Sequence, residues 1–278
     1  MYDNKLDKVQ FSLPKKISYS QIYTYSQCPY KYRFRYLLKF PSQPSKYLSF
    51  GRAIHRAIEK YNKGVIAMSV PTQSSLFLSV EATLPTKDDL YQWFLEYMKN
   101  EWFLNQKERS FYIERGKLLL STFYDQEQKD TNVIIAAEKR FSVEIDNVQI
   151  HGQIDRIDLN DKNNIEVVDY KSGKVKEVPT LKEKEQLFIY AMAIEKNKEI
   201  SINKKVTTLS FYYLADGGKK VSFKMNDEER NSLVTKITST VKKIKEYKFT
   251  PTPSYATCVY CDFKDKCTFA TLQKKEIQ

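Results

Sequence analysis

Residues 148–173 read VQIHGQIDRIDLNDKNNIEVVDYKSG. Two runs rich in β-branched residues flank the polar segment around Lys162, a pattern that predicts two antiparallel strands joined by a short loop. A loop centred on Lys162 sets Asp155 opposite Asp169, with their Cβ atoms about 5 Å apart. Because alternate residues of a strand share one face, Lys171 lies on the same face as Asp169. The stretch therefore predicts two carboxylates and one amine on one face of a sheet.

This group of side chains suits a metal site. Two carboxylates at this separation repel each other, and burial would raise the pKa of one of them unless a cation offsets the charge. Oxygen ligands of this kind suit Mg²⁺ or Mn²⁺. Such an ion activates a water molecule and stabilises charge on a phosphoryl oxygen, and a lysine beside it orients that water. The residues alone leave one alternative, a surface ladder of Asp and Lys side chains without a metal.

The alternation of apolar residues changes within the first of these strands. Apolar positions are even-numbered up to Ile154 and odd-numbered from Ile157 onward, so the inward face changes near Asp155 and Arg156. A β-bulge would produce this change, and bulges are frequent beside active sites. The pattern therefore predicts a bulge next to the carboxylate pair.

The residues that flank this hairpin predict a mixed α/β protein. The run VIIAAEKRFSVEI (133–145) reads as a preceding strand and completes a three-stranded antiparallel meander. A helix is predicted over about 180–197, followed by a second hairpin that turns at Gly217 and Gly218. A last helix is predicted over about 226–247.

The first half of the chain reads as helical. Ser18 begins a helix with a capping-box pattern. The run FGRAIHRAIEKYNKG (50–64) has an apolar stripe of helical period, and Gly64 is predicted to end this helix. Residues 65–86 read as irregular, and a second helical pattern covers about 87–128. The stripe consists of Ile54, Ala57, Ile58 and Tyr61.

A basic pattern lies near the N-terminus. In PYKYRFRYLLKF (29–40), Lys31, Arg35 and Lys39 recur every four residues, which predicts one basic stripe along a helix with tyrosines beside it. The stripe suits contacts with the phosphates of DNA, and a solvated helix face is equally compatible with the pattern.

The composition is that of a basic, aromatic-rich globular protein. The 278 residues carry a formal net charge of +12, which favours a polyanionic partner, either a nucleic acid or an anionic membrane surface; a lysine-rich solvated surface is the alternative. The 20 tyrosines and 16 phenylalanines favour nucleic acid, since aromatic rings stack on unpaired bases. No apolar run reaches the roughly 20 residues of a membrane span. The chain begins without the apolar stretch of a signal peptide, so we expect a soluble cytoplasmic protein with no membrane partner.

Cysteine is concentrated at the C-terminus. Three of the four cysteines fall in CVYCDFKDKC (258–267), and the fourth is Cys28. A reducing compartment disfavours disulfides, so these thiols suit one metal centre. Zinc and a [4Fe–4S] cluster both accept four cysteines, and the residues alone do not choose between them.

Four stretches together resemble the PD-(D/E)XK nuclease superfamily and, within it, the RecB-like exonuclease branch. They are FGRAIHRAIE (50–59), GQIDRID (152–158), VVDYKSGK (167–174) and QLFIYAMAI (186–194). The positions that match the motifs of this branch are His55, Asp155, Asp169, Lys171, Gln186 and Tyr190. Residues 65–130 have no counterpart and are predicted to be a helical insertion.

The resemblance implies roles for the matched residues. Asp155 and Asp169 would act in catalysis and would bind Mg²⁺ or Mn²⁺ together with His55. Lys171 would be a catalytic residue that positions the attacking water. Glu138, in AAEKRF, resembles an acidic catalytic residue on the strand before the metal site.

Two further residues are implied on the helix that follows the site. Gln186 and Tyr190 would contact DNA or the catalytic lysine, and the basic Lys31 and Arg35 would guide the strand. His151, the other histidine, is expected to be structural.

The resemblance also bears on the cysteines. Some RecB-like nucleases, including the AddB type and the CRISPR-associated adaptation nucleases, hold a [4Fe–4S] cluster with one cysteine before the nuclease core and three after it. Cys28, Cys258, Cys261 and Cys267 have this layout. The cluster would act as an iron–sulfur staple that joins residues 17–40 to residues 250–270.

These inferences predict a single domain over 1–278 with a restriction-endonuclease-like core, that is, a mixed central β-sheet flanked by helices. The predicted function is metal-dependent cleavage of DNA, as a single-strand exonuclease in repair or recombination that uses a metal-activated water. One alternative is a CRISPR adaptation nuclease that trims DNA for spacer acquisition. Another is a DNA-binding subunit that does not cut. Possible partners are a helicase or CRISPR adaptation proteins, since the chain has no ATPase motif of its own.

Overall fold

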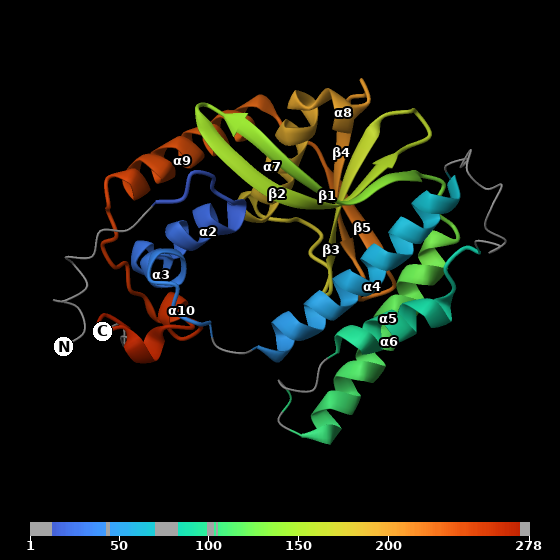
Figure 1. Ribbon diagram of the computed structural model, residues 1–278, viewed down its shortest axis with the longest axis horizontal. Coiled ribbons are helices and arrows are strands. Elements are labelled where there is room, and N and C mark those ends of the chain that lie inside the picture. Colours follow the sequence, from blue (N-terminus) through green and yellow to red (C-terminus); the bar gives the residue numbers. More distant parts are fainter. Residues whose placement is uncertain (1–12, 43–44, 70–82, 99–102, 104, 273–278) are drawn as a thin grey trace, which may run out of the picture. The chain divides into compact units, whose positions relative to one another are not determined.

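The computed structural model describes residues 13–42, 45–69, 83–98, 103 and 105–272, which form two compact units (Figure 1). The first unit comprises the described parts of Met1–Pro44, Ser142–Gly152 and Asp227–Gln278, and the second those of Ser45–Phe141 and Gln153–Asn226. The division leaves the prediction of a single domain untested.

A five-stranded sheet in the order β1-β2-β3-β4-β5 is the centre of the fold. Strand β3 pairs antiparallel with β2 and parallel with β4, and β5 pairs antiparallel with β4, so the sheet is mixed as predicted. The strands are β1 (Val133–Ile145), β2 (Val148–Leu159), β3 (Ile165–Lys171), β4 (Val206–Tyr213) and β5 (Lys219–Phe223). The hairpin tip Ser142–Gly152 belongs to the first unit.

The connections between strands follow the predictions. Helices α7 (Leu181–Lys196) and α8 (Lys198–Ser201) lie in the crossover that makes β4 parallel to β3. The β4–β5 hairpin turns at Gly217 and Gly218, which take φ values of 87° and 76° that suit glycine.

The β2–β3 register is the one that the sequence predicts. Arg156 pairs with Val168, and the pairing continues without a shift as far as Leu159 and Ile165. The same register, extended by one residue, sets Asp155 opposite Asp169.

The predicted bulge at Asp155 and Arg156 stays a prediction, because the described pairs of β2 with β3 begin at Arg156. The pairs of β2 with β3 carry no shift from Arg156 onward, and this part of β2 is buried on both faces. Ile157 is buried on one face, and the charged residues Arg156 and Asp158 are buried on the other. The ion pair between Arg156 and Asp158 allows both to be buried. Charged residues therefore occupy core positions of β2, and the alternation of apolar residues is lost there.

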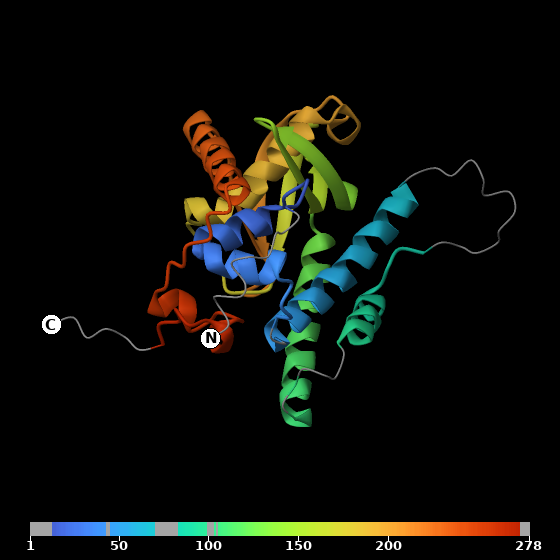
Figure 2. The same ribbon diagram turned by 60° about the vertical axis from the view of Figure 1, so that its left-hand side comes forward.

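Three helices cover one face of the sheet in the second unit. Helices α4 (Lys46–Ser69), α5 (Lys87–Tyr97) and α6 (Gln106–Glu127) pack on one another, as Figures 1 and 2 show. The predicted stripe from Ile54 to Tyr61 is buried in the core between these helices and the sheet. Helix α7 contacts β3 and β4, and its Phe188 meets Phe223 of β5.

Gly64 does not end α4, which continues to Ser69. A Cβ atom at Gly64 would lie 2.4 Å from Pro85 Cγ, so glycine here permits close packing rather than a helix end. The prediction of irregular structure from residue 65 is therefore wrong for 65–69, and residues 70–82 lie outside the described residues.

The first unit is mainly helical. Ser18 caps α2 by accepting a hydrogen bond from the Gln21 backbone amide, as predicted. Helix α2 contacts α9, and the Tyr25 hydroxyl donates to the Lys248 carbonyl. The helices of the first unit are α2 (Tyr19–Gln27), α3 (Pro29–Tyr32), the π-helix η1 (Arg33–Leu37), α9 (Asp227–Lys245), α10 (Tyr255–Cys258) and the 3₁₀ helix η3 (Lys264–Lys266). Within the described ranges, no helix is long and apolar enough to cross a membrane.

The predicted basic stripe does not form, because the chain leaves α-helical geometry at Arg33. A π-helix has more residues per turn than an α-helix, and Lys39 follows its end with a φ of 54°. Arg35 forms an ion pair with Asp262, and Lys31 donates to the Gln27 side chain. The spacing of four residues therefore does not align these three cations.

Candidate metal centre

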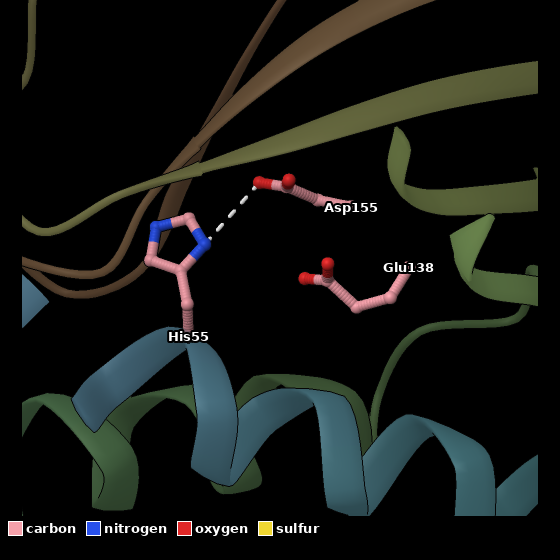
Figure 3. A group of neighbouring side chains, drawn as sticks. All are labelled: His55, Glu138 and Asp155. Carbon is pink, nitrogen blue, oxygen red and sulfur yellow. Dashed lines mark ion pairs between the residues drawn. The ribbon is translucent and has the colours of Figure 1, made fainter. Parts of the chain in front are cut away.

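Three side chains from separate elements of the second unit meet at one point (Figure 3). They are His55 of α4, Glu138 of β1 and Asp155 of β2, and each offers a ligand atom within 4.8 Å of the other two. His55 Nδ1 lies 3.4 Å from Asp155 Oδ2. One imidazole nitrogen and two carboxylate oxygens, partly exposed, form a donor set that fits Mg²⁺ or Mn²⁺.

Strand β3 fixes two of these ligands. The backbone amide of Tyr170 donates to Asp155 Oδ2 over 3.2 Å, and the Tyr170 ring meets the His55 ring edge-on at 6.2 Å between centroids. The Tyr170 hydroxyl in turn accepts a hydrogen bond of 3.0 Å from the Asn62 side chain on α4. Tyr170 therefore ties the carboxylate of β2 to the helix that carries the imidazole.

Glu138 reaches the site through an unusual backbone conformation. Its φ of 50° is left-handed, which is uncommon for a residue within a strand that is not glycine. Gln153 Nε2 donates to the Glu138 carbonyl over 3.1 Å. The sequence predicts Glu138 as a catalytic residue and not as a ligand, and its spacing gives no sign of this backbone turn.

The carboxylates resist ionisation. Burial, then the charges of Asp155 and Glu59, raise the pKa of Glu138 to about 7. Burial, then the charge of Asp169, raise the pKa of Asp155 to about 6. A divalent cation removes this penalty, so the electrostatics of the site fit a metal.

The raised pKa of Glu138 makes a prediction about the metal-free protein. Between its ordinary value of 4.5 and about 7, the folded state binds more protons at Glu138 than the unfolded state does. Wild-type stability therefore falls, relative to a Glu138→Gln variant, as pH rises through this window. Thermal denaturation of wild type and Glu138→Gln in a chelator, at pH 5 and at pH 8, measures the effect. The same difference in melting temperature between the two proteins at both pH values would contradict the prediction.

Asp169 and Lys171 lie beside this group but not within it. Lys171 Nζ is 2.6 Å from Asp169 Oδ2, and the Asp169 side chain is only 4% exposed. Burial lowers the pKa of Lys171, but Asp169, Asp155 and Tyr213 together raise it above its ordinary value, so the amine is charged. The predicted ligand set therefore differs from the observed group, in which Glu138 rather than Asp169 accompanies His55 and Asp155.

Gln186 and Tyr190 lie on α7 and contact each other. Gln186 Nε2 donates to the Tyr190 hydroxyl over 2.5 Å. Tyr190 is 5% exposed and packs edge-on against Phe141 of β1. Burial, with the charges of Asp155 and Asp169, raises its pKa well above the ordinary value. The phenol therefore stays protonated beside the carboxylates, and the predicted contact with DNA is untested.

A buried ion-pair network surrounds Arg156, and the sequence does not predict it. Its guanidinium is fully buried and lies 2.6 Å from both Asp158 and Glu127, with Asp130 at 3.4 Å. Arg156 Nη1 also donates to the Tyr170 hydroxyl over 3.3 Å. The network joins β2 to the end of α6 and reaches the residue that holds Asp155. Its one sign in the sequence is that Arg156, a charged residue, occupies a position of β2 whose side chain faces the core.

The four cysteines line one cavity in the first unit. None forms a disulfide, and Cys258 is buried while the other three are partly buried. Burial raises the pKa of the Cys261 and Cys267 thiols. Aromatic residues pack around them, namely Tyr30, Phe34 and Phe263. The cavity thus brings together the thiols that the sequence predicts to share a site.

Comparisons with known proteins identify a family and several relatives. The sequence profile of the PD-(D/E)XK nuclease superfamily matches residues 16–268. An uncharacterized protein of Rickettsia typhi is 26% identical over 215 residues, which cover 70% of this chain and 23% of that protein. A second relative, from Carboxydothermus hydrogenoformans, is one component of an ATP-dependent helicase/deoxyribonuclease and is 24% identical over 226 residues, or 73% of this chain and 21% of that protein. The chain spans less than a quarter of the length of these two relatives.

A solved structure supports the fold. The crystal structure of a proposed exonuclease from Eubacterium rectale superposes with a TM-score of 0.53 at 12% identity, covering 100% of this chain and 94% of that one. The profile match covers most of the sequence and includes every residue of the metal centre and all four cysteines. The chain belongs to the PD-(D/E)XK nuclease superfamily.

Proposed function

We propose that this protein is a metal-dependent exonuclease that hydrolyses single-stranded DNA in repair or recombination. The observation that carries the proposal is the group of His55, Glu138 and Asp155, whose ligand atoms lie within 4.8 Å of one another. The ion pair of Lys171 with Asp169 beside it supplies a charged amine at the same site. A protein that only binds DNA needs neither.

The chain's own residues would divide the work as follows. His55, Glu138 and Asp155 would hold a divalent cation, with Asp169 near it. When bound, this ion supplies Lewis acidity and lowers the pKa of water. Lys171 would orient the attacking water and offset the charge that grows on the phosphate, because its amine is cationic and its side chain is 38% exposed.

Two features support a DNA substrate and an association with a helicase. The net charge of +12 favours a polyanion, and the aromatic content favours unpaired bases. The Carboxydothermus relative is part of a helicase/deoxyribonuclease, which supports a helicase partner for this chain. The four free cysteines suit the reducing cytoplasm, in keeping with the predicted location.

The test is degradation of end-labelled single-stranded DNA with Mg²⁺ or Mn²⁺, comparing wild type with Lys171→Ala. We expect wild type to shorten the labelled strand from one end. The variant should degrade the strand about 10²–10⁴-fold more slowly. The position of the label gives the polarity. Rapid internal cutting of a circular strand would refute the exonuclease assignment. If wild type binds DNA and cuts no substrate, a non-cleaving DNA-binding protein replaces the nuclease as the better account.

We also propose that the four cysteines hold a [4Fe–4S] cluster. All four cysteines line one cavity, and none forms a disulfide. One of them precedes the nuclease core and three follow it, which is the layout that the resemblance associates with an iron–sulfur cluster. Four thiolates accept such a cluster. Joining residues 17–40 to 250–270 would restrict the unfolded chain and so stabilise the first unit.

The cluster proposal predicts that Cys261→Ser loses iron, sulfide and broad visible absorption, and that the variant melts at a lower temperature. Anaerobic purification with metal analysis measures this. Thr257→Ala is the matched control, because Thr257 lines the same cavity without a thiol, and it should keep its iron. Zinc in place of iron in the anaerobically purified wild type would refute the cluster.

A further inference from the structure

One side of α4 leads from the metal centre to the beginning of the helix. Leu48, Gly51 and Arg52 precede His55 at positions i, i+3 and i+4, with His55 at i+7, so all four residues share one side of the helix. Leu48 is 55% exposed, and Arg52 is exposed as well. At 1.5 Å per residue, this open face of α4, defined by Leu48, Gly51 and Arg52, extends about 10 Å from His55.

Gly51 has no packing role within the described part of the chain. Glycine is unfavourable inside a helix, so it needs a reason. At Gly64 and Gly116 the reason is close contact, because an added Cβ would lie 2.4 Å from Pro85 and 2.1 Å from Phe94, respectively. An added Cβ at Gly51 would find nothing within 4 Å. The clearance above Gly51 is therefore available to another molecule.

The groups beside Gly51 suit a nucleic acid. The Arg52 guanidinium makes no ion pair or hydrogen bond with any residue in the described ranges, whereas Arg56, one turn later, pairs with Glu59 at 2.7 Å. An exposed guanidinium without a carboxylate partner binds phosphate well. Tyr47, in the first turn of α4, is 67% exposed, and Lys46 Nζ lies 5.6 Å from its ring centroid. Such a ring can stack on a base.

We propose that the open face of α4 carries the backbone of a single DNA strand to the metal centre. Gly51 provides the clearance for the sugar–phosphate chain, Arg52 binds a phosphate, and Tyr47 stacks on a base. The inference rests on the proposed nuclease function and specifies the path of its substrate. It also gives DNA-binding residues that the sequence analysis does not single out.

The first test adds side chains at Gly51. Gly51→Ala and Gly51→Leu should melt at the same or a higher temperature than wild type, because both residues favour helix more than glycine does. Both should bind Mn²⁺ as wild type does. Affinity for a fluorescent oligodeoxythymidine, measured in a chelator so that nothing is cut, should fall with side-chain size, by about tenfold or more for leucine. Cleavage of the same strand should fall in parallel.

The second test reverses the charge at Arg52. Arg52→Glu should weaken binding of the oligodeoxythymidine and reduce the dependence of affinity on salt. Lys205→Glu is the matched control, since exposed Lys205 lies beside Ile165 at the start of β3. That position is about 20 Å along the strand from Lys171 at its other end. The control should bind with nearly wild-type affinity.

The outcomes separate this inference from the nuclease proposal. If wild type cuts DNA and Gly51→Leu binds and cuts as well as wild type, the path is wrong and the nuclease proposal stands. If Gly51→Leu is more active than wild type, the face holds an inhibitory segment or protein rather than DNA. If wild type binds the strand through Gly51 and Arg52 but cuts nothing, the path stands and the nuclease proposal fails.

Discussion

We expect the replacement of Asp155 with asparagine to lower the rate of DNA cleavage by about 10³-fold or more and to weaken Mn²⁺ binding. Asp155 lies at the meeting point of the site: it belongs to the three-ligand group, contacts His55 and accepts the amide of Tyr170. A bound cation contributes several kcal/mol to transition-state stabilisation, and each 1.4 kcal/mol is about a tenfold change in rate. Single-turnover cleavage at saturating metal, together with Mn²⁺ titration, measures both effects.

The same substitution should not harm the fold. Burial and the charge of Asp169 raise the pKa of Asp155, so its ionised form is unfavourable in the metal-free protein above about pH 6. Metal-free Asp155→Asn should therefore melt at the same or a higher temperature than wild type at pH 8. Asp161→Asn, in the exposed turn between β2 and β3, is the control and should cut normally. Wild-type cleavage by Asp155→Asn would overturn the metal-site assignment.

Arg156→Ala is expected to cause the largest loss of stability, about 3–5 kcal/mol, because it leaves buried carboxylates without their partner. Asp158 and Glu127 both lie 2.6 Å from the guanidinium and are almost fully buried. Burial already raises the pKa of each, and loss of the guanidinium would raise it further. Chemical denaturation at 25 °C measures the free energy of unfolding.

The pH dependence distinguishes this mechanism from a simple cavity. Once Arg156 is gone, ionising Asp158 or Glu127 opposes folding, so the loss should be greater at pH 8 than at pH 5. A cavity alone would lower the free energy of unfolding by the same amount at both pH values. Arg140→Ala removes an exposed arginine of β1 and should change stability by no more than about 0.5 kcal/mol. An equal loss for Arg140→Ala and Arg156→Ala would refute the role of the network.

The sequence predicts local geometry well. The β2–β3 register follows from hairpin symmetry alone, because a short loop leaves few ways to pair two strands. The buried side of α4 likewise follows from the spacing of Ile54 and Tyr61. Both depend only on residues that are close in sequence.

The errors arise where tertiary contacts override local preference. Glycine is typical of a helix end, but Pro85 packs against Gly64 and the helix continues. Arginine is typical of protein surfaces, but the ion pair with Glu127 of α6 permits the burial of Arg156. The turn at Arg33 into a π-helix leaves no sign in the spacing of Lys31 and Arg35.

The candidate site shows the same division. Hairpin register brings Asp155 and Asp169 together, whereas no local rule brings His55 or Glu138 to them. Those two enter the sequence analysis through family resemblance. That Glu138 rather than Asp169 completes the three-ligand group depends on a left-handed φ in β1, which only the structure reveals.

The three candidate ligands come from separate parts of the chain, and this has a consequence for how the protein folds. The β2–β3 hairpin is local and can form early, whereas His55 joins it only after a loop of about a hundred residues has closed. An early intermediate would thus have its acidic pair but not its imidazole. We expect metal affinity to appear late in refolding, after hairpin formation, so that the chain acquires the capacity to cut only when it is native.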